Sequence, residues 1–150
     1  MYYFAYGSNL NLKQMKSRCP DHKVIMIYAL DNFRLVFRSV ADVEKHHNSK
    51  VYGLIFLISA KDEKNLDTFE GVPNIYKKEY FYAKIGNNDE KVLYYKMNKE
   101  GIGKPTNKYY NAIHEGYLQN DLDVSLLEEA LKYSIKNKKE PIFFSSRWKD

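Results

Sequence analysis

The sequence predicts a single α+β domain over residues 1–150, and three observations support this fold class. Segments with the apolar character of strands are interspersed with segments of helical periodicity along the whole chain. No internal repeat, linker or low-complexity tract divides it. Its 150 residues, of which 44% are hydrophobic and 29% charged, are enough to form one domain with a buried core.

The strand predictions rest on apolar runs and on the alternation of apolar and polar residues. Val51–Ile58 is the most apolar of these segments, and we expect it to be central in the sheet. The polar stretch Asp42–Lys50 is predicted to be a loop, and Gly86–Asp89 the turn of a hairpin. The predicted strands are Tyr2–Tyr6, Val24–Ala29, Phe33–Phe37, Val51–Ile58, Lys78–Ile85 and Lys91–Met97.

The helix predictions rest on apolar faces of helical spacing and on recognisable ends. Pro20 follows the first helix, Gly71 follows the second, and a capping box at Ser125–Glu128 opens the last. The tail Pro141–Trp148 is expected to pack back as an extended segment. The predicted helices are Leu10–Cys19, Lys61–Phe69, Lys108–Gln119 and a segment from Ser125 to Lys139.

Charge and cysteine content narrow the classes of function. Cys19 is the only cysteine, so no internal disulfide can form, which suits a reducing compartment. No apolar run approaches the length of a membrane span, and the first residues lack the features of a secretory signal, so we expect a cytoplasmic protein. The net charge of +5 is spread along the chain, which favours an anionic small substrate over a defined nucleic-acid site.

The segment Tyr6-Gly7-Ser8-Asn9-Leu10 joins the first predicted strand to the first predicted helix. A strand that breaks at glycine and opens into a helix exposes backbone N–H groups without partners, which suit a carboxylate or an oxyanion. Ser8 and Asn9 add side-chain donors. The alternative is an ordinary turn in which Asn9 or Asn11 caps the helix.

Glu70 is the candidate acid/base. It stands at the end of the second predicted helix, directly after Phe69 and before Gly71. The helix dipole favours cations at this end, and positions that break such local rules are enriched in functional residues. The alternative is a solvated surface glutamate. Asp67 lies on the same helix face, and we expect it to be structural.

Other chemistry-bearing arrangements are absent from the sequence. Gly101-Ile102-Gly103-Lys104 lacks the spacing of a phosphate-binding loop, and no serine stands in a Gly-x-Ser-x-Gly motif. The four histidines do not have the spacing of a zinc site. We therefore predict no metal site.

Taken together, two motifs resemble the gamma-glutamylcyclotransferase family. The first is Tyr6-Gly7-Ser8-Asn9-Leu10, and the second is Leu66-Asp67-x-x-Glu70-Gly71-Val72-Pro73 with Tyr76 beyond it. A third block is similar to the segment that follows the last core strand of that family; it consists of Pro105, Tyr109, Ile113 and Gly116. The blocks cover most of the chain in the family's order.

The resemblance implies a mixed sheet curled into a barrel-like core with helices packed outside. It also implies release of 5-oxoproline from a small gamma-glutamyl compound without a cofactor or metal, with Glu70 as the acid/base. The loop would anchor the glutamyl group, and two tyrosines would form pocket walls with hydroxyls facing the substrate. The substrate-binding residues implied are Tyr6, Gly7, Ser8, Asn9, Leu10, Tyr76 and Tyr109. The leaving group and the oligomeric state are left open.

Two other functions remain open at this point. The same fold could serve as a non-catalytic ligand-binding module, although such a module has no need of Glu70. The basic chain could instead bind nucleic acid. Nucleic-acid binding would weaken steeply with salt, whereas 5-oxoproline release would depend on it only weakly.

Overall fold

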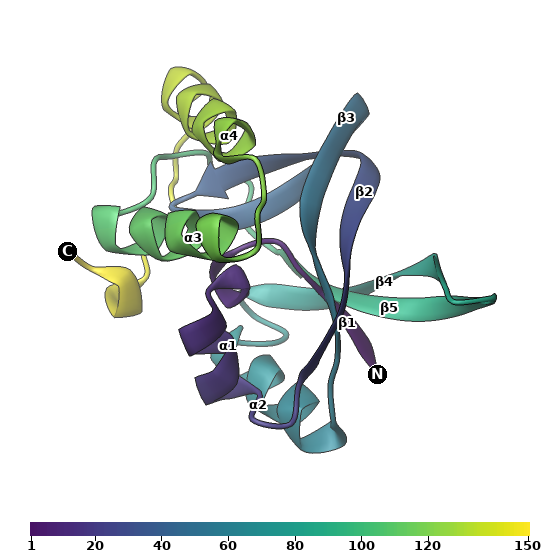
Figure 1. The fold of residues 1–150 in the computed structure, drawn as a ribbon. Helices are drawn as coiled ribbons and strands as arrows, with labels where there is room; N and C mark the ends of the chain where they lie inside the picture. The colour runs from purple at the N-terminus through teal and green to yellow at the C-terminus, as the bar shows by residue number, and fades with distance from the viewer.

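Strand β1 (Tyr2–Ala5) lies at the centre of a five-stranded mixed sheet with the order β2-β3-β1-β5-β4. The computed structural model describes all residues, 1–150. β1 pairs antiparallel with β3 and parallel with β5, and it ends beneath the helices (Figure 1). The other strands are β2 (Lys23–Arg38), β3 (Val40–Leu57), β4 (Tyr76–Ile85) and β5 (Asn88–Met97).

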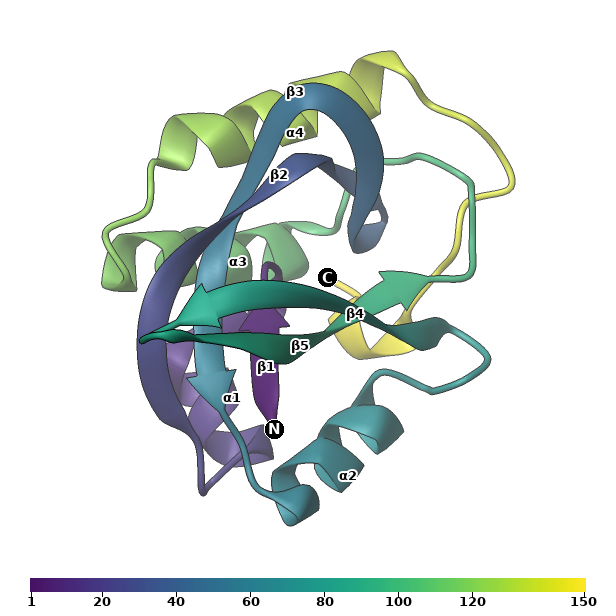
Figure 2. The same ribbon diagram turned by 90° about the vertical axis from the view of Figure 1, so that its right-hand side faces the viewer.

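The sheet curls but does not close. Its two edge strands, β2 and β4, are not paired with each other. The curl nevertheless brings their side chains together, because the rings of Tyr28 on β2 and Phe81 on β4 stack with centroids 5.3 Å apart. Figure 2 shows the long β2–β3 hairpin arching over the β4–β5 hairpin. The predicted α+β class with a curled mixed sheet is confirmed.

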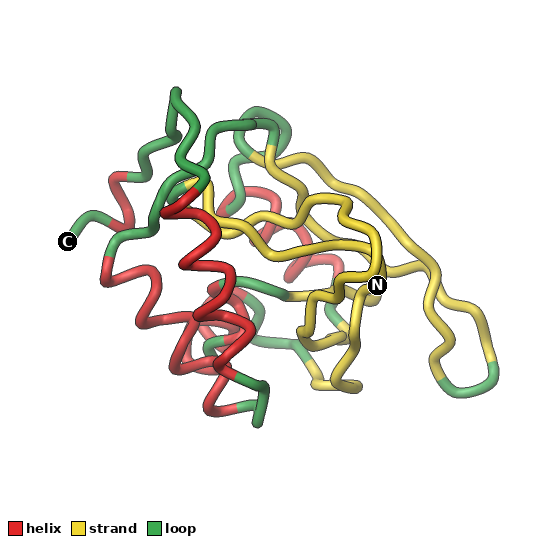
Figure 3. The backbone as a smooth tube through the Cα atoms, turned by 90° about the horizontal axis from the view of Figure 1, so that it is seen from above, coloured by secondary structure: helices red, strands yellow, loops and turns green.

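The helices gather on one side of the sheet, and the β4–β5 hairpin projects on the other (Figure 3). α4 packs on β2, and α3 packs on the short 3-10 helix η1 that follows β1. No helix is long and apolar enough to cross a membrane. The helices are η1 (Ser8–Leu10), α1 (Leu12–Arg18), α2 (Ala60–Phe69), α3 (Asn107–Gln119), α4 (Val124–Lys136) and η2 (Ser146–Trp148).

Gly116 on α3 allows that helix to lie directly against η1. A Cβ atom at this position would be 2.6 Å from the carbonyl carbon of Leu10 and 2.7 Å from the nitrogen of Asn11. Cβ atoms in proteins essentially never come within 3.0 Å of such neighbours. Because residue 116 has no side chain, α3 can pack directly against the end of the Tyr6–Leu10 loop.

The prediction that Asp42–Lys50 is a loop is wrong. These residues belong to β3, which pairs with β2 in a register that joins Phe37 to Ala41 and Leu35 to Val43. Local polarity is misleading here because Asp42, Glu44 and Lys50 have charged partners within the fold. The predicted break between Ala29 and Phe33 is likewise absent, and an irregularity in the ladder between Asp31 and Phe33 takes its place.

The capping box predicted at Ser125–Glu128 is also wrong. Asp123 is the N-cap of α4, and its carboxylate accepts a hydrogen bond from the N–H of Ser125 at 2.9 Å. The helix therefore begins one residue earlier, at Val124. Asp123 is the acceptor at this end of the helix in place of Ser125.

Asp42 is the charged hub that joins the β2–β3 hairpin to β5. Its carboxylate is completely buried. One oxygen accepts hydrogen bonds from Arg38 Nε at 2.8 Å and from Lys96 Nζ at 2.7 Å, and the other accepts from the N–H of Met97 at 3.0 Å. A buried carboxylate is tolerated only with such partners. This network fixes the first residues of β3, which border the pocket described below.

Removing this hub should be far more costly than removing an exposed ion pair. We expect Asp42→Ala to lower the free energy of unfolding by about 3–5 kcal/mol, because two cations lose their buried partner. Asp31→Ala is the matched control, since Asp31 pairs with Lys50 at 3.4 Å on the surface, and its cost should stay below about 1 kcal/mol. Urea denaturation of both variants measures these values. Equal costs would show that Asp42 is not a hub.

Candidate active site

A pocket that opens to solvent lies where β1 ends. Its walls come from the loop after β1, the start of β3, the end of α2, the starts of β4 and α3, and the tail after α4. It brings together Glu70 and all but one of the predicted substrate-binding residues, namely Tyr6, Gly7, Ser8, Asn9, Tyr76 and Tyr109. Leu10 is the exception, because its side chain is fully buried and does not line the pocket.

The loop after β1 presents backbone donors to this pocket. The first hydrogen bond of η1 joins the N–H of Leu10 to the carbonyl of Gly7 at 3.0 Å, so the N–H groups of Ser8 and Asn9 precede the helical ladder. The N–H of Gly7 has no hydrogen-bond partner. A Cβ atom on Gly7 would lie 3.2 Å from the Cβ of Ala41, a tight contact that would require Ala41 to shift by a few tenths of an ångström.

The side chains of this loop are held by neighbours. The Asn9 amide donates to the Tyr3 hydroxyl at 2.9 Å, and its oxygen accepts a hydrogen bond from Arg18. The same guanidinium donates to Ser8 Oγ at 3.2 Å. Asn11 caps α1 by accepting from the N–H of Gln14, which is one of the two caps expected for a turn. The side chains of Ser8 and Asn9 are therefore engaged by neighbours, and the backbone N–H groups of the loop remain as its free donors. Asn9 helps to hold the loop in place.

Glu70 is placed at the pocket by the end of α2. Its N–H donates to the carbonyl of Leu66 at 2.8 Å, and Gly71 then reverses the chain with a φ of 65°. This conformation is the one that favours glycine. The Glu70 side chain makes no hydrogen bond to the protein. Asp67, by contrast, is bound by Lys78 at 3.0 Å and by the Tyr95 hydroxyl at 2.7 Å, which confirms its structural role.

Burial raises the pKa of the Glu70 carboxyl from 4.5 to about 7. The residue keeps some contact with solvent through the mouth, yet protein atoms surround its carboxyl closely. Arg18 and Arg147 hold this pKa below the value that desolvation alone would give. A carboxyl group that is close to half ionised at neutral pH can both take and return a proton.

Two tyrosine hydroxyls form hydrogen bonds with the backbone of Ala41 in β3. Tyr76 donates to the carbonyl of Ala41 at 2.7 Å, and the N–H of Ala41 donates to Tyr109 at 2.8 Å. Burial keeps the pKa of Tyr109 well above its usual value, so its hydroxyl stays protonated. Because this oxygen accepts from Ala41, its own proton is free for another acceptor. The Tyr6 hydroxyl donates to the carbonyl of Tyr95.

No group of three or more His, Cys, Asp or Glu side chains is arranged to hold a metal ion. Cys19 is buried, and burial raises the pKa of its thiol to about 12. A thiol in that state is a poor nucleophile. Acid/base chemistry at Glu70, assisted by the donors around it, is what the pocket can perform.

The sequence matches the family model described as "Gamma-glutamyl cyclotransferase, AIG2-like" over residues 3–120. The chain belongs to this family. The resemblance drawn from the motifs around Gly7 and Glu70 is therefore confirmed. No curated protein sequence matches the chain.

Solved structures share the fold of this cyclotransferase-family chain. One is described as a gamma-glutamyl cyclotransferase, with 20% identity, a TM-score of 0.76, and coverage of 98% of this chain and 94% of the other. Another is the uncharacterised human protein loc79017, with 21% identity, a TM-score of 0.73, and coverage of 97% and 91%. YkqA from Bacillus subtilis has 20% identity and a TM-score of 0.70, covering 93% of this chain and 55% of its own.

The tail of this family member lies beyond the matched residues yet borders the pocket. Figure 2 shows the segment after α4 running down beside the start of β4. The sequence predicts that the tail packs back but indicates no function for it, and it contains no signal that singles out Arg18 or Arg147. Neither arginine stands in a recognisable motif. The tail residues that line the pocket are Phe143, Ser145, Arg147 and Trp148.

The raised pKa of Glu70 makes a prediction about stability. The folded protein holds this proton more tightly than the unfolded chain, so the group stabilises the fold at low pH, and this contribution is lost as the pH rises through about 7. At neutral pH we expect Glu70→Gln to be more stable than the wild type, by at most about 3 kcal/mol. The advantage should shrink toward pH 4.5.

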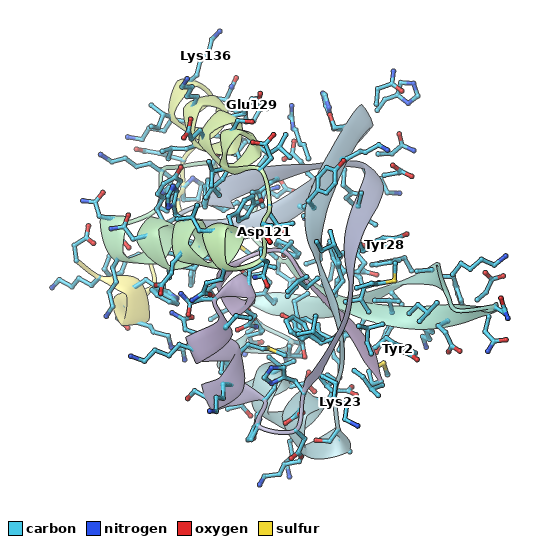
Figure 4. The ribbon with its side chains drawn as sticks, in the orientation of Figure 1. Tyr2, Lys23, Tyr28, Asp121, Glu129 and Lys136 are labelled. Carbon is cyan, nitrogen blue, oxygen red and sulfur yellow. The ribbon has the colours of Figure 1, made fainter.

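Thermal melts from acid to neutral pH measure this difference. Glu129→Gln is the matched control, because Glu129 lies exposed on α4 (Figure 4) and should show no such trend. A Glu70→Gln protein that is less stable than the wild type at every pH would contradict the assigned environment of the carboxyl.

Proposed function

We propose that this chain is a gamma-glutamyl cyclotransferase that releases 5-oxoproline and a free amine or amino acid from a gamma-glutamyl compound. The observation that carries the proposal is the Glu70 carboxyl, which lines a pocket without a hydrogen-bond partner and has a pKa of about 7. A carboxyl without a partner does not stabilise the folded protein at neutral pH, but it is well suited to proton transfer. Membership of the family supports the same reaction.

In the proposed reaction the substrate supplies its own nucleophile. The α-amine of a gamma-glutamyl amide can reach the γ-carbonyl carbon of the same molecule and close a five-membered ring. Because this amine is mostly protonated at neutral pH, ionised Glu70 first removes a proton from it. The amine nitrogen then bonds to the carbonyl carbon, and the carbonyl oxygen becomes an oxyanion.

Collapse of this intermediate breaks the original amide bond. Glu70 returns its proton to the departing nitrogen, which leaves as a neutral amine. The ring nitrogen, which still carries two hydrogens after the attack, releases one of them to solvent, and the ring remains as neutral 5-oxoproline. The pocket also holds the glutamyl chain folded, so that the two reacting atoms stay close. The reaction requires no oxidant or reductant and no covalent intermediate with the enzyme.

The loop after β1 supplies donors for the negative charges of this reaction. The N–H groups of Gly7, Ser8 and Asn9 can bind the α-carboxylate or the oxyanion, and a donor of this kind contributes about 3 kcal/mol in other acyl-transfer sites. The free proton of Tyr109 is a further donor near Gly7, since its oxygen would be 3.4 Å from a Cβ atom there. Tyr6 and Tyr76 shape the pocket through their bonds to backbone carbonyls.

We further propose that the whole chain, residues 1–150, acts as one cytoplasmic domain on a small molecule and not on nucleic acid. The diffuse distribution of basic residues supports this, because no basic stripe of the kind that tracks a phosphate backbone is evident in the sequence. The proposed chemistry needs no cofactor, since the substrate carries both reacting groups.

We expect turnover of gamma-glutamyl amides that have a free α-amine and none after that amine is acetylated. The amine is the nucleophile, and acetylation removes its lone pair from reaction. Mass spectrometry of a panel of gamma-glutamyl amino acids, gamma-glutamyl amines and glutathione would identify 5-oxoproline as the product. Equal cleavage of the acetylated compounds, with acetylglutamate as the product, would indicate an ordinary amidase instead.

Glu70→Gln is the control for this experiment. It keeps the shape of the side chain but cannot take a proton, so turnover should fall by about a hundredfold or more. Binding of the compounds by the wild type without any release of 5-oxoproline would instead support a non-catalytic binding module.

A further inference from the structure

The tail after α4 is firmly placed at the mouth of the pocket. Trp148 is buried, and its ring meets that of Tyr109 edge-on with centroids 4.9 Å apart. The Thr106 hydroxyl donates to the carbonyl of Trp148. The Asp150 carboxylate accepts hydrogen bonds from the N–H groups of Asn107 and Lys108 at 3.1 and 2.8 Å, at the start of α3. The neighbouring residue Arg147 is therefore held at a defined position.

Arg147 and Arg18 both stack on Phe69, the residue before Glu70. Their guanidinium carbons lie 3.8 and 3.3 Å from the centroid of the ring, so the ring lies between the two groups, because both cannot occupy one face. Arg147 Nη1 also donates to the carbonyl of Phe69 at 3.0 Å. Stacking and one hydrogen bond fix the plane of the Arg147 guanidinium and leave its other N–H groups unused.

Neither arginine forms an ion pair with a carboxylate. The Arg18 donors are directed at the loop, whereas Arg147 is exposed and lines the pocket. Ser8 and Asn9, which also line the pocket, are buried. If the glutamyl group occupies the buried end near the loop, its leaving group must extend toward the mouth and pass Arg147.

Because a planar guanidinium matches a carboxylate, we propose that Arg147 binds a carboxylate on the leaving group, so that the enzyme prefers gamma-glutamyl amino acids to gamma-glutamyl amines. This inference rests on the proposed function. It assigns the preference to a tail that lies outside residues 3–120, the part of the chain matched by the family model.

Two substrates that differ only in this carboxylate test the proposal. Gamma-glutamyl-alanine and gamma-glutamyl-ethylamide have the same leaving group apart from the carboxylate of alanine. We expect the wild type to have a kcat/KM about tenfold higher for the alanine compound, which corresponds to one charge-assisted hydrogen-bonded contact at a partly exposed site. Arg147→Gln should bring the ratio of the two kcat/KM values close to one, through a higher KM for the alanine compound.

Three further measurements separate recognition from mere support of the fold. Arg147→Lys should restore part of the ratio, because it keeps the charge but not the planar fork. Lys149→Gln, an exposed neighbour outside the pocket lining, removes the same charge and should leave the ratio unchanged. The wild-type ratio should fall as the salt concentration rises. Thermal melts check that every variant is folded.

The outcomes are distinguishable. If Arg147→Gln lowers kcat/KM equally for both substrates, Arg147 only supports Phe69 and Glu70, and the proposal is wrong. An unchanged ratio in this variant, or no preference in the wild type, also overturns it. If the wild type releases 5-oxoproline from neither substrate nor from any other gamma-glutamyl compound, the proposed function itself fails, and the inference fails with it.

Discussion

The buried negative charge of Asp42 is the constraint on which the placement of the pocket depends. An uncompensated carboxylate in the core is costly, so Arg38 from β2, Lys96 from β5 and the backbone at Met97 must converge on it. Their convergence fixes the start of β3 against β5. Ala41, the residue before Asp42, then lies where two tyrosine hydroxyls form hydrogen bonds with its N–H and C=O groups at the wall of the pocket.

The fold treats its two key carboxylates in opposite ways. Asp42 is fully buried and receives three hydrogen bonds, whereas Glu70 faces the pocket and receives none from the protein. The first arrangement gives the carboxylate two cationic partners and a backbone N–H, and the second leaves the proton on Glu70 at neutral pH about as often as off it. The paired carboxylate of Asp42 stabilises the wall of the pocket. The unpaired carboxyl of Glu70 is the group to which we assign proton transfer.

The sequence revealed the fold class and most elements because hydrophobic periodicity is a local signal. The α2 helix and the β4–β5 hairpin were predicted nearly to their ends for this reason. The start of β3 was missed because its polar residues are stabilised by partners distant in the sequence, such as Lys96 for Asp42. Such pairings depend on the tertiary fold, which local composition does not contain.

The candidate site was predictable to a similar extent. Gly7 was identified because a strand breaks there and leads into a helix, and Glu70 because a carboxylate at the end of a helix opposes the helix dipole. Both also stand in family motifs. Arg18 and Arg147 were missed, since an arginine in a short helix or in a tail resembles a solvated side chain until the fold stacks both on Phe69. The neighbourhood of Glu70, and with it the raised pKa, follows only from the assembled structure.

The pH dependence of kcat/KM for 5-oxoproline release tests the central claim most directly, because this parameter reports the ionisation of the free enzyme. If Glu70 is the base, kcat/KM should fall about tenfold per pH unit on the acid side of an apparent pKa near 7. A profile that stays flat from pH 5 to pH 7, or an acid limb near the ordinary value of about 4.3 for a glutamate, would contradict the account.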